Sequence, residues 1–250
     1  MKKSILLLLL GMMAGGCLAQ EEDVFFPTDR PGYTWGTDVL PLHKISWENG
    51  FSLERDPEQR TAYLPSTIVR YGIFENVELR VGTDWQFHEE SASLTKSSGM
   101  TPLTLGTKIK CYEGDGWLPS VGLLAQLQSA RLGSEELLPS QPAPSLYLIF
   151  ENPVNDWFYV CYNAGLEWDG ETATPTTFLA LCLGFDITDQ LGTFVETYNY
   201  LHPEGNQYLT ELGLYYMPSP RVQLDIEVDL DFQQLKDYFN VGFGVAWMIN

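Results

Sequence analysis

A strict two-residue alternation between residues 77 and 87 limits the folds open to this chain. One set of positions holds the mainly apolar side chains Val77, Leu79, Val81, Thr83, Trp85 and Phe87. The set between them holds Glu78, Arg80, Gly82, Asp84 and Gln86. Because successive strand residues point to opposite faces, the segment predicts a strand with one apolar and one charged face. A soluble sandwich would bury the apolar face, whereas a membrane barrel would turn it to lipid and the charged face to the lumen.

Segments of the same kind recur along the chain. This strand forms a hairpin with the segment before it, and the turn between them is Phe74-Glu75-Asn76. We expect about twelve strands, each good to a few residues at its ends, at Lys44–Arg55, Ala62–Ile73, Val77–His88, Pro102–Tyr112, Leu118–Ala130, Pro144–Glu151, Trp157–Trp168, Thr176–Ile187, Leu191–Leu201, Gln207–Met217, Arg221–Phe232 and Tyr238–Asn250. No amphipathic helix of normal length and no linker interrupts them, so the sequence predicts one all-β domain.

The connections between these strands alternate in length. Tight turns that are polar or carry Pro or Gly follow Ile73, Tyr112, Glu151, Ile187 and Met217. The clearly longer loops are Glu89–Thr101, Arg131–Ala143 and Asp169–Pro175. Outer-membrane barrels have short turns at one end and longer loops at the other, and a soluble sandwich has no reason to separate them. The pattern therefore favours an antiparallel transmembrane β-barrel of about twelve strands.

The last predicted strand supports this architecture. It alternates aromatic or aliphatic residues with small ones up to Asn250, as expected of a closing strand that the outer-membrane assembly machinery reads. An aromatic final residue would fit that role better than Asn250 does. Strands of about 10 to 12 residues are long enough to cross a bilayer when tilted. Most tryptophans lie near predicted strand ends, where amphipathic rings prefer the membrane interface.

The first 19 residues have the features of a signal peptide. Lys2 and Lys3 precede an apolar run, Ile5–Met13, and small residues follow before a cleavage site at Gln20. The run is too short for a membrane helix. Cys17 follows two glycines, which makes a poor lipid-attachment motif, and its lipidation is left open. Loss of the two lysines changes the net charge from −19 to −21, so nucleic acid is not an expected partner.

Residues 20–42 form an irregular segment before the barrel at 43–250. Pro27, Pro31 and Gly32 lie close together, which excludes a helix or a central strand there. We expect an N-terminal arm or a plug.

Charged residues on the predicted lumen face are the candidate pore-lining residues. Basic side chains on neighbouring early strands are Arg70, Arg80, Lys108 and Lys110, with Glu78 and Asp84 beside them. Acidic side chains on late strands are Glu196, Glu211, Asp225, Glu227, Asp229 and Asp231. Such clusters could orient hydrated solutes in an open pore, or pair with one another in a structural network.

Two motifs resemble a known family. Thr28-Asp29-Arg30-Pro31 precedes the strand Ile45-Ser46-Trp47-Glu48-Asn49-Gly50, and the hairpin Ile68–Gly82 carries an RYG…ELRVG pattern. Both are similar to landmarks of the phenol-degradation (MetA-pathway) outer-membrane transporter family, and the similarity extends over Thr28–Asn250. This resemblance implies an outer-membrane β-barrel that transports hydrophobic or aromatic solutes, and it brings no catalytic residues.

Enzymatic chemistry has little support in the sequence. His88 lies beside Glu89, Glu90 and Ser91, but a lipid hydrolase would need a histidine and a serine on one face near the rim, and the spacing does not provide this. We expect a solvated loop histidine, no catalytic or metal site and no cofactor.

Three cysteines remain after the signal peptide: Cys111, Cys161 and Cys182. Cys161 and Cys182 face inward at positions symmetric about the loop between their strands, so a cross-strand disulfide is a further hypothesis.

The sequence thus predicts a bacterial outer-membrane channel or transporter for the passive passage of small solutes. The expected partners are outer-membrane lipid, the assembly machinery and a small-molecule solute. Two alternatives stay open: a structural or surface-binding barrel that uses the loops Glu89–Thr101 and Arg131–Ala143, and a membrane-embedded lipid enzyme that uses His88.

Overall fold

The computed structural model describes residues 27–91, 95–202, 205–231 and 238–249. The predicted signal peptide at 1–19, with Cys17, and residues 20–26 of the predicted arm lie outside this part of the chain. Among the described residues, no helix is both long enough and apolar enough to cross a membrane.

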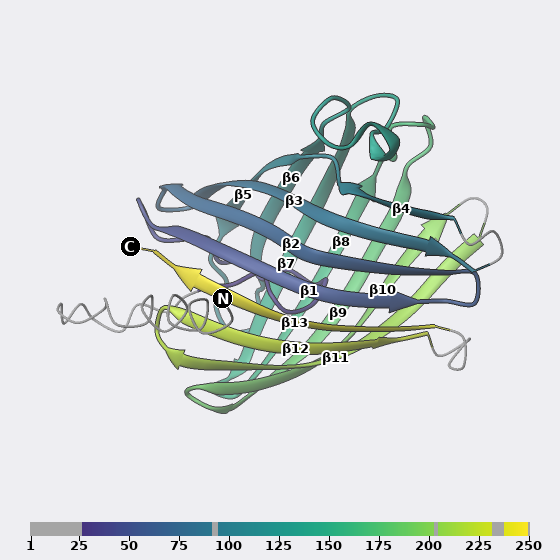
Figure 1. The fold of residues 1–250 in the computed structure, drawn as a ribbon. Helices are drawn as coiled ribbons and strands as arrows, with labels where there is room; N and C mark the ends of the chain where they lie inside the picture. The colour runs from purple at the N-terminus through teal and green to yellow at the C-terminus, as the bar shows by residue number, and fades with distance from the viewer. Residues whose placement is uncertain (1–26, 92–94, 203–204, 232–237, 250) are drawn as a thin grey trace, which may run out of the picture.

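The described chain is almost entirely β-structure (Figure 1). The strands are β1 (Ile45–Arg55), β2 (Gln59–Phe74), β3 (Val77–Glu90), β4 (Lys96–Met100), β5 (Thr104–Tyr112), β6 (Ser120–Gln128), β7 (Ala143–Asn155), β8 (Phe158–Glu167), β9 (Thr176–Thr188), β10 (Leu191–His202), β11 (Gly205–Ser219), β12 (Val222–Leu230) and β13 (Phe239–Met248). A 3₁₀ turn, Glu135–Leu137, lies in the β6–β7 loop.

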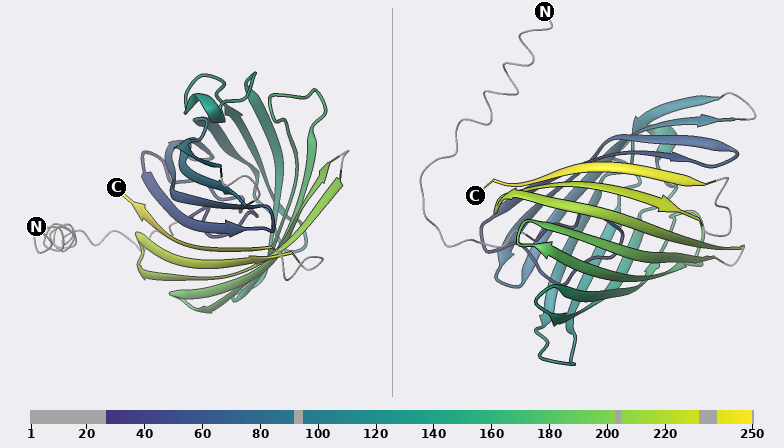
Figure 2. Two further views of the ribbon diagram at one scale, coloured as in Figure 1. Left: turned by 45° about the vertical axis from the view of Figure 1, so that its right-hand side comes forward. Right: turned by 90° about the horizontal axis from the view of Figure 1, so that it is seen from below.

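These strands form one closed antiparallel barrel (Figure 2). Sequence neighbours pair with each other except β4 and β5, which both pair with β3, and β1 closes the ring by pairing with β13, with Trp47 opposite Trp247. Strand β4 extends the line of β5: β5 pairs with β3 at Val77–Gly82, and β4 pairs with β3 at Trp85–Glu89. The wall therefore has twelve strand positions and one extra strand segment, which confirms the predicted barrel.

Strand β4 was not expected, because residues 96–100 were assigned to the loop Glu89–Thr101. Ser and Gly residues without an apolar alternation gave no strand signal there. Three residues, 101–103, separate β4 from β5, and Pro102 among them has no N–H to donate to a ladder. The neighbouring Thr101 is held instead by its N–H, which donates to the carbonyl of Asp84 (2.8 Å).

The two faces of the β2–β3 hairpin distinguish a membrane barrel from a soluble sandwich. Arg70, Glu78 and Arg80 are buried inside the barrel, whereas Leu79 and Trp85 are each 44% exposed on the outside. This is the reverse of a soluble protein, in which the apolar face would be the buried one.

The two ends of the barrel differ in their connections. The connections at 75–76, 113–119, 156–157, 189–190 and 220–221 lie where β1 begins and β13 ends, and we call this the turn end. The connections at 56–58, 129–142 and 168–175 lie at the opposite end, which we call the loop end. The longest of them, 129–142, stands at the top of the barrel in Figure 1.

Candidate functional site in the barrel interior

Residues 27–44 run through the turn-end half of the barrel interior, and we call this segment the arm (Figure 2, purple). Its side chains and backbone are bound by residues that project inward from the wall. The partners come from β1, β2, β3, β5, β7, β8, β10 and β12. The arm therefore meets the wall on several sides.

Asp29 of the arm lies in a cluster of basic residues. Its carboxylate is 2.8 Å from Nζ of Lys108 and 3.6 Å from Arg70, and it is in direct contact with Arg80. Glu78 completes the cluster, since Arg70 donates to it from Nε and Nη2 at 2.8 Å each. Such two-point guanidinium–carboxylate pairs are strong and directional, which explains how these charges stay buried.

Arg30, the next residue, binds an acidic part of the wall. Its guanidinium is 3.0 Å from Asp225 and 3.5 Å from Glu227 on β12. The side chain lies over Gly50 and Gly244, which are cross-strand partners on β1 and β13. A Cβ at either glycine would come within 2.2 Å of the guanidinium nitrogens. The two glycines thus leave the space that the guanidinium of Arg30 occupies, and a larger residue at either position would fill it. We call this space the seat of Arg30.

Other inward carboxylates accept hydrogen bonds from the backbone of the arm. Glu196 accepts from the N–H groups of Tyr33 (2.6 Å) and Thr34 (3.0 Å). Glu151 accepts from the N–H of Thr37 at 2.8 Å. An irregular segment has no ladder to satisfy its backbone groups, so buried side chains must do so. These acids therefore act as acceptors for the arm.

Asn163 and Glu78 also bind the backbone of the arm. Asn163 accepts from the N–H of Trp35 (2.8 Å) and donates to its carbonyl (3.1 Å). Glu78 accepts from the N–H of Leu40 at 2.9 Å. Glu78 thereby links the basic cluster to the far end of the arm.

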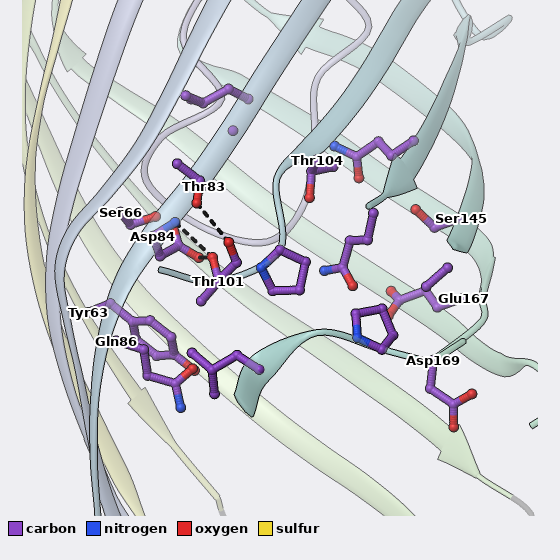
Figure 3. A pocket seen from close by; sticks show the side chains of 18 of the residues that line it. Tyr63, Ser66, Thr83, Asp84, Gln86, Thr101, Thr104, Ser145, Glu167 and Asp169 are labelled. Atoms are coloured by element: carbon purple, nitrogen blue, oxygen red, sulfur yellow. Dashed lines mark hydrogen bonds between the residues drawn. The ribbon is translucent and has the colours of Figure 1, made fainter. Parts of the chain in front are cut away.

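A cavity of about 890 Å³ occupies the interior beside the arm and extends to the loop end (Figure 3). Arm residues, including Arg30 and Trp35, line one part of it, and residues of the β6–β7 and β8–β9 loops line the other. Figure 3 shows Tyr63 and Gln86 on one side of the cavity and Glu167 on the other. The cavity is large enough for a small organic molecule.

Aromatic rings form part of the wall of this cavity. Trp35 packs on Tyr147 and Phe178 with ring centroids 4.6 and 5.8 Å apart, and Tyr147 meets Phe178 edge-on at 5.7 Å. Tyr200 continues the cluster, 5.3 Å from Phe178. The interior therefore combines an ion-paired layer around the arm with an aromatic surface beside it.

The two loops at the mouth of the cavity are joined to each other. The N–H and the hydroxyl of Ser140 both donate to Glu171, at 2.7 Å each. These bonds lower the pKa of Glu171, and the N–H groups of Thr172 and Glu171 likewise lower the pKa of Asp169. Both carboxyl groups lie in the β8–β9 loop, outside the strands.

The structure gives each predicted pore-lining residue a position. Buried in the interior are Arg70, Glu78, Arg80, Lys108, Glu196, Glu211, Asp225, Glu227, Asp229 and Asp231. Asp84 accepts from the Thr101 side chain at 3.4 Å, and Lys110 is 2.9 Å from Asp38 of the arm. Most of these groups meet the arm or one another, so they do not form a simple open ring.

Two of the late acidic residues, Glu211 and Asp229, meet other side chains of the wall. Glu211 lies directly opposite Glu196 and Asp229 on the neighbouring strands. Asp229 accepts from the hydroxyl of Tyr198 (3.0 Å) and from Asn240 (2.8 Å). This group extends the acidic side of the wall toward the loop end.

Sequence reasoning missed the arm's own contribution to the site. Asp29, Arg30, Glu151 and Asn163 were not among the candidates. One signal was available: Asp29 and Arg30 are adjacent residues of opposite charge in a proline-rich segment that has no secondary structure. Glu151 and Asn163 gave no distinguishing signal, because many strand positions carry such residues.

Two further hypotheses can be located. Cys161 and Cys182 are directly opposite each other on β8 and β9, both buried and both free thiols, so the disulfide stays a prediction. His88 lies near the loop end of β3, with Nδ1 3.1 Å from the hydroxyl of Thr61. In the described residues, no group of three or more His, Cys, Asp or Glu side chains could hold a metal ion.

Comparison with known families agrees with this architecture. The model of one family, described as "Putative MetA-pathway of phenol degradation", matches residues 28–249. The chain belongs to this family. Its match begins at Thr28, so it includes the Asp29–Arg30 pair and most of the arm. No protein with a curated description matches the chain.

Solved structures show the same barrel in porins. A KdgM porin in complex with disordered oligogalacturonate is 11% identical with a TM-score of 0.60, covering 82% of this chain and 99% of its own. The NanC porin is 10% identical with a TM-score of 0.55, covering 80% of this chain and 98% of its own. At these identities the similarity concerns the fold alone.

Proposed function

We propose that this protein is a bacterial outer-membrane channel or transporter through which small solutes pass without a driving reaction. Membership of the family and the porin-type barrel support this proposal. The loop end then faces the cell exterior and the turn end faces the periplasm, as in outer-membrane barrels generally. Outer-membrane lipid and the assembly machinery that inserts such barrels are the corresponding partners.

The outer surface supports insertion in a bilayer. Ile226 and Phe243 are 50% and 59% exposed, and similar side chains surround the barrel. A soluble protein rarely exposes so much continuous apolar surface. Trp47 and Trp247 lie side by side near the turn end, and Trp85 lies toward the loop end, where indole rings prefer the membrane interfaces.

One observation carries the proposal: the cavity of about 890 Å³ inside a closed barrel wall, with the arm beneath it. A solute entering from the loop end would reach this cavity first. Because the arm is bound to the wall on several sides, passage onward to the turn end requires the arm to move. The arm is therefore a plug that gates the channel.

The aromatic surface of the cavity supports a solute with an apolar or aromatic part. Trp35 and Tyr147 present two rings in contact, tilted by 58° to each other, at the cavity wall, and aromatic rings pack well against planar ligands. The family's name points to aromatic compounds in general.

Recordings of the protein in planar bilayers test the channel. We expect low conductance from the native protein and higher conductance when Asp29→Asn and Arg30→Gln are combined, because both ion-paired anchors of the plug are then lost. Glu75→Gln, in the exposed β2–β3 turn, is the matched control and leaves conductance at the native level. Neutralising Asp225 and Glu227 together should act like the loss of Arg30, since these are its partners.

A silent trace from every variant, with no solute uptake into liposomes, would contradict transport. It would favour the second candidate function, a structural or surface-binding barrel that presents the β6–β7 loop. That candidate has one observation in its support: the buried ion pairs around the arm would suit a permanent plug.

The location can be tested independently of transport. We expect the protein in the outer-membrane fraction, and we expect its mobility in SDS gels to shift on heating, as barrels do when they unfold. A soluble protein without that shift would contradict the membrane assignment.

A further inference from the structure

The cavity above the arm has an unbalanced charge. Its lining includes the carboxylates of Asp84, Glu136, Glu167, Asp169 and Glu171 toward the loop end. Among the residues that the structure describes, the basic side chains in the lining are Arg30, Arg80 and His202. The two arginines are engaged in ion pairs within the arm layer, Arg30 with β12 and Arg80 with Asp29. The two arginines are thus paired within the arm layer and do not offset the carboxylates above it, so the space above the arm is negative.

The same space is lined by aromatic rings. Trp35, Tyr63, Tyr147 and Trp168 all contribute to the cavity wall. The faces of such rings carry negative potential and attract cations, most strongly where water is displaced. An aromatic surface beside an excess of carboxylates is the chemistry that recognises an ammonium group attached to an apolar body.

Glu167 occupies the central position in this arrangement. It is the last residue of β8, half-buried, and Figure 3 shows it beside Ser145 at the cavity wall. No lysine or arginine in the described chain forms an ion pair with it; it interacts with the hydroxyl of Tyr147 and, electrostatically, with the imidazole of His202, which also lines the cavity. Tyr147 in turn packs on Trp35. One carboxylate and two rings therefore meet at the same part of the cavity.

We infer that the cavity binds organic cations, namely amines or quaternary ammonium compounds that carry an aromatic or aliphatic group. The ring or chain packs on Trp35 and Tyr147, and the cationic group lies toward Glu167 and the acids of the loop end. The inference rests on the proposed channel function, whose solute it specifies. Anions are repelled by the same carboxylates, which makes the cavity selective by charge.

Three probes that share a phenyl ring separate charge from shape: benzyltrimethylammonium, benzyl alcohol and benzoate. Binding to the full-length protein in detergent is measured by titration calorimetry. We expect the cation to bind about tenfold more tightly than the alcohol and benzoate to bind more weakly still. Glu167→Gln should weaken cation binding about tenfold and leave the alcohol unchanged.

Glu75→Gln is the matched control, because it removes the same charge at the opposite end of the barrel. Equal binding of the three probes, a preference for benzoate or benzyl alcohol, or equal effects of Glu167→Gln and Glu75→Gln would overturn the inference. Loosening of the arm is checked by protease digestion of each variant, so that a general structural change in Glu167→Gln is recognised.

Uptake of the three probes into liposomes distinguishes this inference from the proposed function. Uptake is compared with protein-free liposomes, because benzyl alcohol crosses lipid unaided. If the cation binds selectively but the protein speeds the entry of no probe in any variant, the inference stands and the channel fails. If the protein speeds the entry of benzoate while the cation neither binds nor crosses, the channel stands and the inference fails.

Discussion

Asp29 and Arg30 are adjacent in the chain, yet their side chains form ion pairs with different parts of the barrel wall. Asp29 meets the basic cluster of β2, β3 and β5, and Arg30 meets the acids of β12. In the sheet, β1 and β13 lie between these two regions. The dipeptide therefore links two wall regions of opposite charge, and it holds the arm against both.

Loss of the Arg30 charge should release this part of the arm. Arg30→Gln leaves Asp225 and Glu227 without their cation, and removing one partner of a buried ion pair costs about 3–5 kcal/mol. We expect higher conductance in bilayers and faster proteolysis of the arm. Arg30→Lys, which keeps the charge but not the fork of donors, should give an intermediate effect. Native-level conductance and proteolysis in Arg30→Gln would show that this ion pair does not hold the arm.

The seat of Arg30 offers a second test from the wall side. In Gly244→Ala the added Cβ would lie 2.2 Å from Nε of Arg30, so the guanidinium must leave its position. We expect the same gain in conductance as in Arg30→Gln, and no additional gain when the two changes are combined. Gly122→Ala is the matched control, because its nearest neighbour would be 3.4 Å away, an ordinary contact. An equal effect of both glycine changes would argue against a specific seat.

The wall of the barrel was predictable because apolar and polar residues alternate along its strands with a period of two. The alternation in β3 and β12 assigns each side chain to the inside or the outside without knowledge of any partner strand. The order of short turns and long loops then fixes which end is which. Strand β4 escaped prediction because Lys96–Met100 contains small polar residues and owes its strand form to pairing with β3.

The interior was only half predictable. The period places Glu196 and Arg70 inside, but it does not show what they bind, since their partners lie on an irregular segment far away in sequence. The contact between Glu196 and Tyr33 spans 163 residues and depends on where the arm folds back. Side-chain alternation contains no information on that path.

The cysteine pair can be tested by alkylation. Cys161 and Cys182 are directly opposite on β8 and β9 and buried, whereas Cys111 is exposed. Residues directly opposite in an antiparallel pair have Cβ atoms about 4.5–5.5 Å apart, near the range that a disulfide spans. We predict that oxidation closes the bond, so that alkylation without reductant in denaturant labels Cys111 alone. Three labelled thiols in the mature chain, measured by mass, would exclude the disulfide.

The contact between the two loops at the cavity mouth should weaken in acid. Hydrogen bonds from Ser140 lower the pKa of Glu171 in the folded protein, so their contribution is fully present above the ordinary glutamate pKa of about 4.3. It is lost as the pH falls through the lowered pKa, because the protonated carboxyl accepts these bonds poorly. We expect the amides of Ser140 and Gln141 to exchange hydrogen faster, after correction for intrinsic rates, at pH 3 than at pH 6.

Two variants define the origin of that acid effect. Glu171→Gln should show fast exchange at both pH values, since its neutral side chain binds Ser140 weakly whatever the pH. Glu135→Gln, exposed in the same β6–β7 loop, should keep the native pH dependence. If Glu171→Gln retained the acid-induced change, another group would be responsible, and the Ser140–Glu171 contact would not be what joins the loops.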